Sequence, residues 1–341
     1  MSGPDLQRQE LPRAICEGAR NSANRARLQY RCTRFNESRS IDAEEDRRSR
    51  VLPPADVLSA MSEAPNAMMK LPAEQVRQLA LTAIRIEGLT IVWHKGTPRQ
   101  ETPLEDWSEH LRFTRDGPGS RLPIIGRSGS GKSSLLYVLA ALKRPAVGRL
   151  SYEFQSADGA SWQLTIEADL KDPEWARRAR FLRRHCLGYL DQDTRLLPYL
   201  RMRENLEAVP RLLTGWRDEH QNRVDGMLPR LFPEVSESKP QDFPATLSGG
   251  QRRRAAMFPL MVDPPRVLFA DEPTGSLDPA LSRSLLDEVG AWQGETGSVF
   301  IWVTHDDPAG LGQRAGQVLD FGNGGGPRLM SAMAAANHGG V

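Results

Sequence analysis

One short stretch constrains this chain more than any other: Gly126-Arg-Ser-Gly-Ser-Gly-Lys-Ser133, with the spacing G-x-x-x-x-G-K-S. It follows an apolar run at residues 122–125 and leads into a helix expected at residues 133–142. Glycines let such a loop curl so that its backbone N–H groups point at phosphate oxygens, and the following helix directs the positive end of its dipole to the same place. The stretch therefore predicts a phosphate-binding loop between a buried strand and a helix.

The side chains of this loop have separate expected tasks. Lys132 places a positive charge on the β- and γ-phosphates of a nucleoside triphosphate, and the Ser133 hydroxyl is a ligand for Mg²⁺. A chance Gly/Ser-rich loop is the alternative, and the strand and helix on either side argue against it. The loop residues predicted to bind the nucleotide are Gly126, Arg127, Ser128, Gly129, Ser130, Gly131, Lys132, Ser133 and Ser134.

A second apolar run, residues 267–270, ends in two adjacent acids, Asp271 and Glu272. Such pairs are usually solvated loop charges, but a preceding phosphate-binding loop favours a role in catalysis. Successive side chains of a strand point to opposite faces, so the two acids can act differently. We expect Asp271 to hold Mg²⁺ and Glu272 to act on the attacking water as general base.

A Ser/Gly motif, Leu247-Ser-Gly-Gly-Gln251, lies between the loop and the acidic pair. In that position it is highly specific, and the three motifs together closely resemble the nucleotide-binding domain of ABC transporters. The resemblance covers roughly residues 83–322. It implies an α/β fold, namely a P-loop NTPase core of the ABC-ATPase type with an inserted helical subdomain at about residues 195–257.

The remaining motifs of that family follow in order. Gln192 in GYLDQD resembles the Q-loop glutamine, Ser276-Leu-Asp278 the D-loop, and His305 in VTHD the switch histidine. By resemblance, catalysis falls to Glu272, His305 and Gln192, and Mg²⁺ binding to Ser133, Gln192 and Asp271. The nucleotide contacts implied beyond the loop are Trp93, as an aromatic that stacks on adenine, and Ser248, Gly249, Gly250, Gln251 and Asp278.

Longer phrases look like the cassettes of the lipoprotein-releasing and macrolide-efflux exporters: RSGSGKSSLL, GYLDQDTRLLPYLRMRENL and LFADEPTGSLD. The resemblance implies a subunit that hydrolyses ATP, with Mg²⁺, to power export of a lipoprotein, a peptide or a hydrophobic drug. Two copies would pair head to tail, with each ATP between the loop of one copy and the signature motif (residues 247–251) of the other. A separate membrane-spanning permease would complete the transporter, with this chain on the cytoplasmic face of the plasma membrane.

Two alternatives stay open: a soluble ABC-type ATPase that acts on ribosomes or DNA, and a regulatory cassette. Ribosome-acting relatives carry two cassettes, whereas this chain has one signature motif, and the extended heptads or cysteine clusters of DNA-repair relatives are missing. A regulatory cassette would need a lesion at a catalytic position, and none is visible. The net charge of +2 and the lack of a basic stripe argue against a nucleic-acid partner.

Residues 1–78 differ from the rest, since they are rich in Arg, Ser, Asn, Asp and Glu and lack sustained periodicity. Such a segment buries little apolar area, so we expect a disordered N-terminal extension before a cassette at residues 79–341. Deletion of residues 1–70 should then leave the fold intact. A true start near Met68 or Met69 is the alternative.

Two further features bear on partners and packing. No run approaches the roughly 18 apolar residues that cross a bilayer, so another chain would supply the membrane span. The apolar residues Leu196–Leu200 follow Gln192 and either face that permease or pack inside the helical subdomain.

Other residues carry structural expectations. Pro259 falls in the helix expected after the signature motif, which should kink or end there. Cys16, Cys32 and Cys186 are too far apart for a zinc site or disulfide framework, and Cys186 reads as a buried thiol. The polar segment at residues 96–120 is longer than the usual hairpin.

Overall fold

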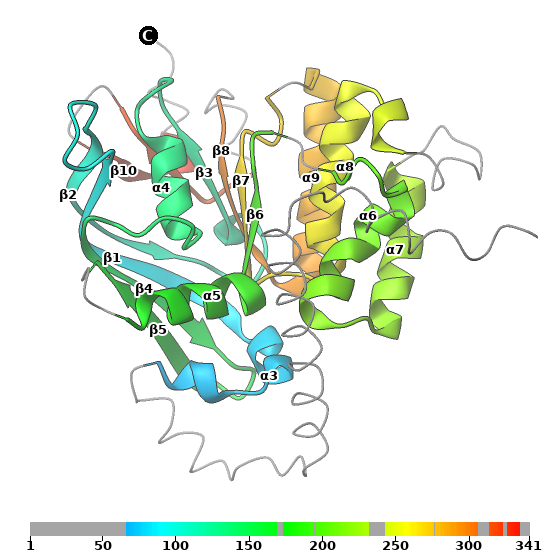
Figure 1. Cartoon of the computed structure of the whole chain (residues 1–341), viewed down its shortest axis with the longest axis horizontal. Helices are drawn as coiled ribbons and strands as arrows, with labels where there is room; N and C mark the ends of the chain where they lie inside the picture. The colour runs from blue at the N-terminus through cyan, green and yellow to red at the C-terminus, as the bar shows by residue number, and fades with distance from the viewer. Residues whose placement is uncertain are drawn as a thin grey trace, which may run out of the picture. The chain divides into compact units, whose positions relative to one another are not determined.

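The computed structural model describes residues 66–168, 173–193, 196–231, 243–275, 277–305, 314–322 and 326–334. Their strands are β1 (Ala80–Trp93), β2 (Glu101–Arg112), β3 (Arg121–Ile125), β4 (Val147–Gln155), β5 (Ser161–Glu167), β6 (Leu187–Leu190), β7 (Val267–Asp271), β8 (Val299–Val303), β9 (Gln317–Asp320) and β10 (Arg328–Ser331). They form an antiparallel sheet with the order β2-β1-β4-β5 and a six-stranded sheet with the order β10-β9-β3-β8-β7-β6, parallel except for β10 (Figure 1).

Along the sequence, most of the described α-helices lie between strands of the larger sheet. They are α3 (Ala73–Gln78), α4 (Lys132–Leu139), α5 (Trp175–His185), α6 (Met202–Val209), α7 (Asp218–Leu231), α8 (Gly249–Val262) and α9 (Pro279–Thr296). Short turns of other helix types are η1 (Ala67–Lys70), η2 (Pro118–Ser120), η3 (Pro210–Thr214) and η5 (Pro244–Thr246). Among the described residues, none of these helices combines the length and the apolar character that crossing a bilayer requires.

The six-stranded sheet separates two hydrophobic cores. Val267 and Phe269 of β7 pack into the first core, which joins both sheets and α4, whereas Leu268 and Ala270 pack into the second core with α6 to α9. Side chains alternate between faces along a strand, and a parallel sheet covered on both faces therefore reads as an unbroken apolar run. As a result, α4 lies on one face of this sheet and α8 and α9 on the other (Figure 1).

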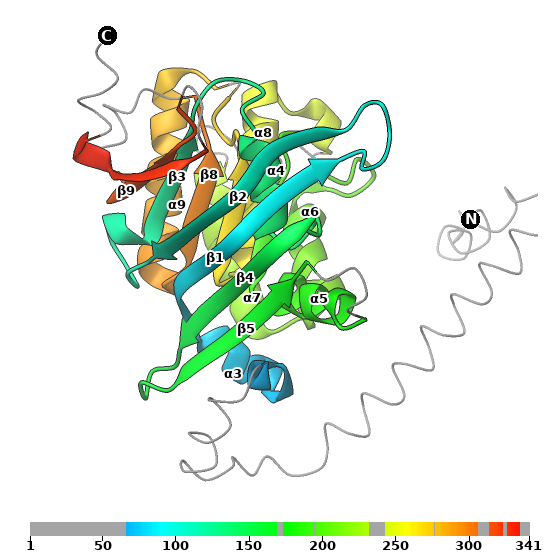
Figure 2. The same ribbon diagram turned by 90° about the vertical axis from the view of Figure 1, so that its left-hand side faces the viewer.

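The antiparallel sheet contains β2, inside the segment that the sequence suggests is only a long polar hairpin. Figure 2 shows β2 beside β1 over most of its length. Its buried side chains, Leu104, Trp107 and Leu111, are not evenly spaced. The register of the β1–β2 pair shifts between Ile86 and Leu89 and again before Ile91. These irregularities break the alternation of period two that identifies a half-buried strand.

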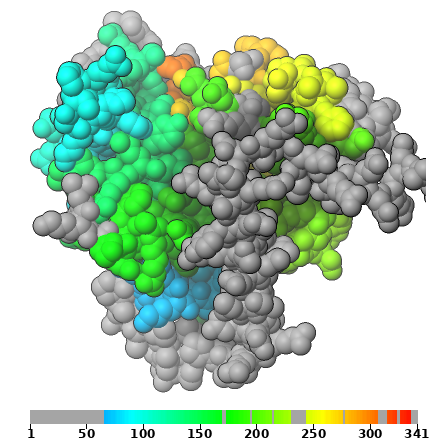
Figure 3. Space-filling view, in the orientation of Figure 1, coloured from blue at the N-terminus to red at the C-terminus, as the bar shows by residue number. Residues whose placement is uncertain are grey.

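The ordered part of the chain begins before residue 79, where the sequence predicts the start of the cassette. Residues 66–78 contain η1 and α3. Met68 is 0% exposed, and the Asn66 side-chain oxygen accepts a hydrogen bond from the Thr165 backbone N–H at 3.0 Å. Figure 3 shows the blue segment of these residues against the bright green of α5, which α3 contacts. Tertiary contacts thus hold a segment that has little periodicity of its own. Residues 1–65, also expected to be disordered, lie outside the described residues.

Because Met68 is buried, deletion of residues 1–70 should destabilise the protein relative to deletion of residues 1–65. Truncation of a buried Met costs about 2–5 kcal/mol, which corresponds to a drop in the thermal midpoint on the order of 5–15 °C. Differential scanning fluorimetry on the two truncated proteins measures the difference. Equal midpoints would show that the contacts of Met68 contribute little to folding.

The helix after the signature motif does not end at Pro259, which was one of the two outcomes expected there, and a kink stays a prediction. α8 continues to Val262, and Phe258 and Met261 on either side of the proline are buried in the second core. Tertiary burial therefore holds the helix together despite the backbone hydrogen bond that Pro259 cannot make. Cys186 is buried as expected, and burial raises the pKa of its thiol to about 12.

Candidate nucleotide-binding and catalytic site

The loop between β3 and α4 adopts left-handed backbone angles that favour glycine. The φ angles are 136° at Gly126, 76° at Gly129 and 101° at Gly131. A Cβ atom on Gly126 would come within 2.8 Å of the Phe321 Cβ, and one on Gly131 within 3.0 Å of the Pro103 Cβ. Conformation and close packing both explain these glycines, and the curled loop ends where the N-terminus of α4 presents unbonded N–H groups.

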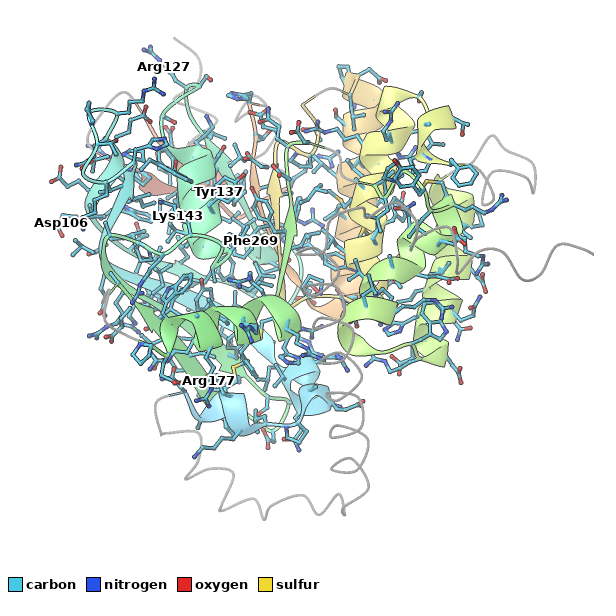
Figure 4. All side chains as sticks on the ribbon, viewed as in Figure 1. Asp106, Arg127, Tyr137, Lys143, Arg177 and Phe269 are labelled. Atoms are coloured by element: carbon cyan, nitrogen blue, oxygen red, sulfur yellow. The ribbon has the colours of Figure 1, made fainter. Side chains whose placement is uncertain are left out.

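Lys132 lies inside this curl, with only 5% of its surface exposed. Its Nζ donates hydrogen bonds to the carbonyl oxygens of Gly126 at 2.8 Å and Arg127 at 2.7 Å; Figure 4 labels Arg127. Burial lowers the pKa of Lys132, an effect opposed by the Glu272 and Asp271 carboxylates. An ammonium that is bonded to neutral carbonyls gains from exchanging them for charged phosphate oxygens.

Ser133 and Asp271 meet across the same site. The Ser133 hydroxyl donates a hydrogen bond to the Asp271 Oδ1 at 3.1 Å. Burial raises the pKa of Asp271, and the hydrogen bond from Ser133 opposes this rise. A hydroxyl and a carboxylate fit the oxygen ligands that Mg²⁺ prefers. In the described part of the chain, no group of three or more His, Cys, Asp or Glu side chains is arranged so that it could hold a metal ion.

Three predicted catalytic side chains converge at the C-terminal ends of neighbouring parallel strands. Gln192 follows β6, Glu272 follows β7 and His305 follows β8. The Gln192 Nε2 donates to the Glu272 Oε2 at 3.2 Å, and the His305 Nε2 lies 2.9 Å from the Glu272 Oε1. Ligands of open α/β sheets bind outside these strand ends. The structure places Gln192 on Glu272, and its predicted contact with Mg²⁺ stays a prediction.

Glu272 has a strained backbone for a residue with a side chain. Its φ angle is 47°, in the left-handed region. Its N–H donates to the Val303 carbonyl of β8 at 3.1 Å, which fixes the turn after β7 to the neighbouring strand. Left-handed residues other than glycine persist where their surroundings hold them, and they gather at functional sites.

Trp93 lies beside the phosphate loop, although its ring is partly covered. Its indole N–H donates to the Ser134 hydroxyl at 2.9 Å, and the Lys143 Nζ lies 3.9 Å from its ring centroid. Tyr137 packs edge-on against it, with centroids 6.2 Å apart; Figure 4 labels both Tyr137 and Lys143. An adenine stacking on the face that Lys143 covers must displace that lysine. Adenine stacking on Trp93 therefore stays a prediction.

The signature motif begins α8 with a capping box. The Ser248 Oγ accepts from the Gln251 N–H at 3.2 Å, and the Gln251 side chain accepts in return from the Ser248 N–H at 3.0 Å. Gly249 and Gly250, which lie between Ser248 and Gln251, are the first two residues of the helix. The side chain of Gln251 is thus engaged in fixing the helix start, and the predicted contact of Gln251 with nucleotide is untested.

Asp278 caps α9 in a similar way. Its Oδ1 accepts hydrogen bonds from the N–H groups of Ala280 at 2.9 Å and Leu281 at 3.0 Å. This capping role is local, and a contact between Asp278 and nucleotide stays a prediction. Ser276, the first residue of the predicted D-loop, lies outside the described residues.

The helices that begin at the phosphate loop and at the signature motif pack on opposite faces of the six-stranded sheet. α4 packs into the first core and α8 into the second. Within the described ranges, no hydrogen bond joins residues 247–251 to residues 126–134. The two predicted parts of the nucleotide site therefore do not meet within one chain.

Arg253 is a residue of the site that the sequence does not single out. Its guanidinium donates to the backbone carbonyls of Gln192, Glu272 and Pro273. In the sequence it is the middle residue of an Arg-Arg-Arg run, which reads as a solvated helix face. Only the three-dimensional contacts distinguish it from its neighbours.

Comparisons with known proteins identify the family of this chain. Residues 114–275 match the family described as ABC transporter. The lipoprotein-releasing system ATP-binding protein LolD of Bordetella pertussis is 32% identical over 243 residues, which cover 71% of this chain and 94% of LolD. The macrolide export ATP-binding/permease protein MacB of Rhodopseudomonas palustris is 35% identical over 212 residues, which cover 61% of this chain and 28% of MacB.

A solved structure supports the same assignment. The dimeric structure of MJ0796, a bacterial ABC transporter cassette, matches with a TM-score of 0.55 and 25% identity, covering 73% of this chain and 98% of that one. Family, relatives and fold all identify an ATP-binding cassette. The chain belongs to the ABC transporter family, as one of its ATP-hydrolysing cassettes.

Proposed function

We propose that this chain is the ATP-hydrolysing subunit of an exporter whose membrane-spanning permease is a separate chain. The observation that carries the proposal is the convergence of Gln192, Glu272 and His305 at the strand ends beside the Lys132 loop. The names of the relatives, a lipoprotein-releasing and a macrolide export protein, support a lipoprotein or a hydrophobic drug as cargo, and a peptide stays a further possibility of the same proposal. We propose that the chain works on the cytoplasmic face of the plasma membrane, beside that permease.

The residues of the site would divide the work of hydrolysis. The loop N–H groups and Lys132 would hold the phosphates of ATP. Ser133 and Asp271 would hold Mg²⁺, which would neutralise part of the phosphate charge. Glu272 accepts the proton of the attacking water. His305 and Gln192, each bonded to one carboxylate oxygen, hold the Glu272 side chain in place.

We propose further that two copies pair head to tail. Within one chain, α4 and α8 pack on opposite faces of the sheet and no described hydrogen bond joins the motif to the loop, so the signature motif would complete a nucleotide site in another copy. The capping box fixes the start of α8 at Gly249 and Gly250. The N–H groups of such a helix start can bind an anion, here the γ-phosphate. The dimeric form of MJ0796 supports this pairing. ATP would then hold the pair together until hydrolysis.

A groove beside Gln192 is the proposed seat of the permease. One hollow of about 210 Å³ is lined by Asp191, Leu196 and Leu197 among others, and it adjoins a second of about 230 Å³. The two hollows share Tyr189, Val209 and Leu260. Leu196 packs against the second core, whereas Leu197 is 48% and Tyr199 90% exposed. Their exposure favours permease contact over packing inside the helical subdomain.

Tyr199→Asp should reduce recovery of the chain with membranes by roughly 10-fold or more, because it introduces a charge into an apolar contact. The isolated subunit should keep its basal ATP hydrolysis. Leu212→Asp is the matched control, because Leu212 is 73% exposed and lies in η3. Neither Tyr199 nor Leu212 lines the hollows, but Tyr199 lies two residues after Leu197, which does. Both variants are measured by fractionation of cells that also express the permease. Unchanged membrane recovery of Tyr199→Asp would place the docking surface elsewhere, and its unfolding would favour a packing role for Tyr199.

A further inference from the structure

Arg253 connects the signature helix to both loops that carry catalytic side chains. Its Nε donates to the Pro273 carbonyl at 3.2 Å and its Nη1 to the Gln192 carbonyl at 3.1 Å, while its Nη2 donates to the Glu272 carbonyl. All three acceptors are backbone atoms, in the loops that follow β6 and β7. One side chain of α8 therefore bonds the two loops to each other and to the helix.

The arginines on either side do not share this role. The Arg252 guanidinium donates to the Leu247 carbonyl of its own segment, and the Arg254 guanidinium lies 3.7 Å from the Glu288 carboxylate of α9. The planar guanidinium holds its donors in a fixed fork, so the three carbonyls bonded to Arg253 are held at set positions relative to one another. A lysine at this position has a compact ammonium, which cannot bond to all three carbonyls at once.

The bond to the Glu272 carbonyl bears directly on catalysis. Glu272 is held in the left-handed region, with its N–H bonded to β8 and its carbonyl bonded to Arg253. A shift of α8 thus moves the backbone of Glu272 and of Gln192 together. Since their side chains are in contact at 3.2 Å, such a shift changes the geometry around the general base.

We propose that Arg253 is a positioning residue that couples the two nucleotide sites of the dimer. This inference rests on the head-to-tail pairing proposed above. In that pair, the start of α8 binds the nucleotide held by the partner subunit, whereas Gln192 and Glu272 act on the nucleotide of their own chain. The capping box of residues 248–251 fixes the helix start, and Arg253 carries its position to the catalytic loops. Occupation of one site then sets the catalytic geometry of the other.

The test compares ATP hydrolysis by the full chain and its Arg253→Gln and Arg253→Lys variants over a range of ATP concentrations. The wild-type protein should respond with a Hill coefficient above one. Arg253→Gln should respond with a Hill coefficient near one and a kcat reduced on the order of 10- to 100-fold, since misplacement by about 1 Å can cost 10²-fold. Its ATP affinity by calorimetry should stay close to wild type, because Arg253 does not touch the phosphate loop. Arg253→Lys should recover part of kcat and little of the cooperativity.

Arg252→Gln is the matched control, and its kcat and Hill coefficient should equal those of the wild type. The proposal is overturned if Arg253→Gln keeps the wild-type kcat and Hill coefficient, if Arg252→Gln loses both equally, or if the wild-type response shows no cooperativity. If Arg253→Gln does not fold, the double variant Arg253→Lys with Glu272→Gln tests the proposal by its dimerisation with ATP. That protein should still dimerise with ATP, which separates loss of coupling from loss of the nucleotide site. A wild-type chain that neither hydrolyses ATP nor dimerises with it would instead contradict the proposed function.

Discussion

Glu272→Gln should bind ATP normally and hydrolyse it slower by a factor on the order of 10²–10⁴. The amide has nearly the shape of the carboxylate and can keep contacts with Gln192 and His305, but it cannot accept a proton from water. Since hydrolysis is the step that separates the ATP-bound pair, the variant should accumulate as a dimer in the presence of ATP. Phosphate release and size-exclusion chromatography with light scattering measure the two effects.

The control for this variant is Glu295→Gln, which makes the same substitution at an exposed position of α9. It should hydrolyse ATP at the wild-type rate and should not trap a dimer. Near-wild-type hydrolysis by Glu272→Gln would show that another group takes the proton. Loss of ATP binding would show that the carboxylate holds the site together and does not act only as a base.

Lys132→Ala should lose ATP affinity as well as turnover, which distinguishes it from Glu272→Gln. The ammonium meets phosphate in the ground state, and a hydrogen bond to a charged group contributes about 1.5–3 kcal/mol. The dissociation constant for ATP should therefore rise on the order of 10- to 100-fold. Removal of the buried ammonium also leaves the carbonyls of Gly126 and Arg127 without their partner.

Isothermal titration calorimetry measures this affinity, and Lys95→Ala, which changes an exposed lysine, is the control. The control should bind ATP as the wild type does. An unchanged ATP affinity in Lys132→Ala would count against the assignment of residues 126–134 as the phosphate-binding loop. A thermal midpoint close to that of the wild type would exclude unfolding as the cause of any loss.

The parts of the site that the sequence predicts are those where chemistry follows directly on a buried strand. The runs before Gly126, Asp271 and His305 are unbroken apolar stretches, because both faces of the parallel sheet are covered. Parallel strands place their carboxyl ends at one edge, so residues distant in the chain meet there. The glycine spacing of the loop is equally visible, since it reflects backbone angles that other residues rarely adopt.

The parts that the sequence does not predict depend on contacts without a local pattern. β2 is hidden because bulges disturb its alternation. Met68 is buried by the sheet and not by periodicity in its own segment. Arg253 has two identical neighbours, and only its bonds to the catalytic loops separate it from them. The sequence predicts an adenine contact for Trp93 from its position, but it does not indicate the lysine that lies over its ring.

The central proposal is that ATP hydrolysis by this chain drives a membrane permease. The most direct measurement is ATP hydrolysis by the full chain in lipid vesicles, with and without the multi-span protein that copurifies with it from membranes. The proposal predicts that the membrane protein changes the hydrolysis rate, that Tyr199→Asp removes this change, and that Leu212→Asp does not. A chain that copurifies with no multi-span protein, or whose hydrolysis is the same in its presence and absence, would contradict the proposal.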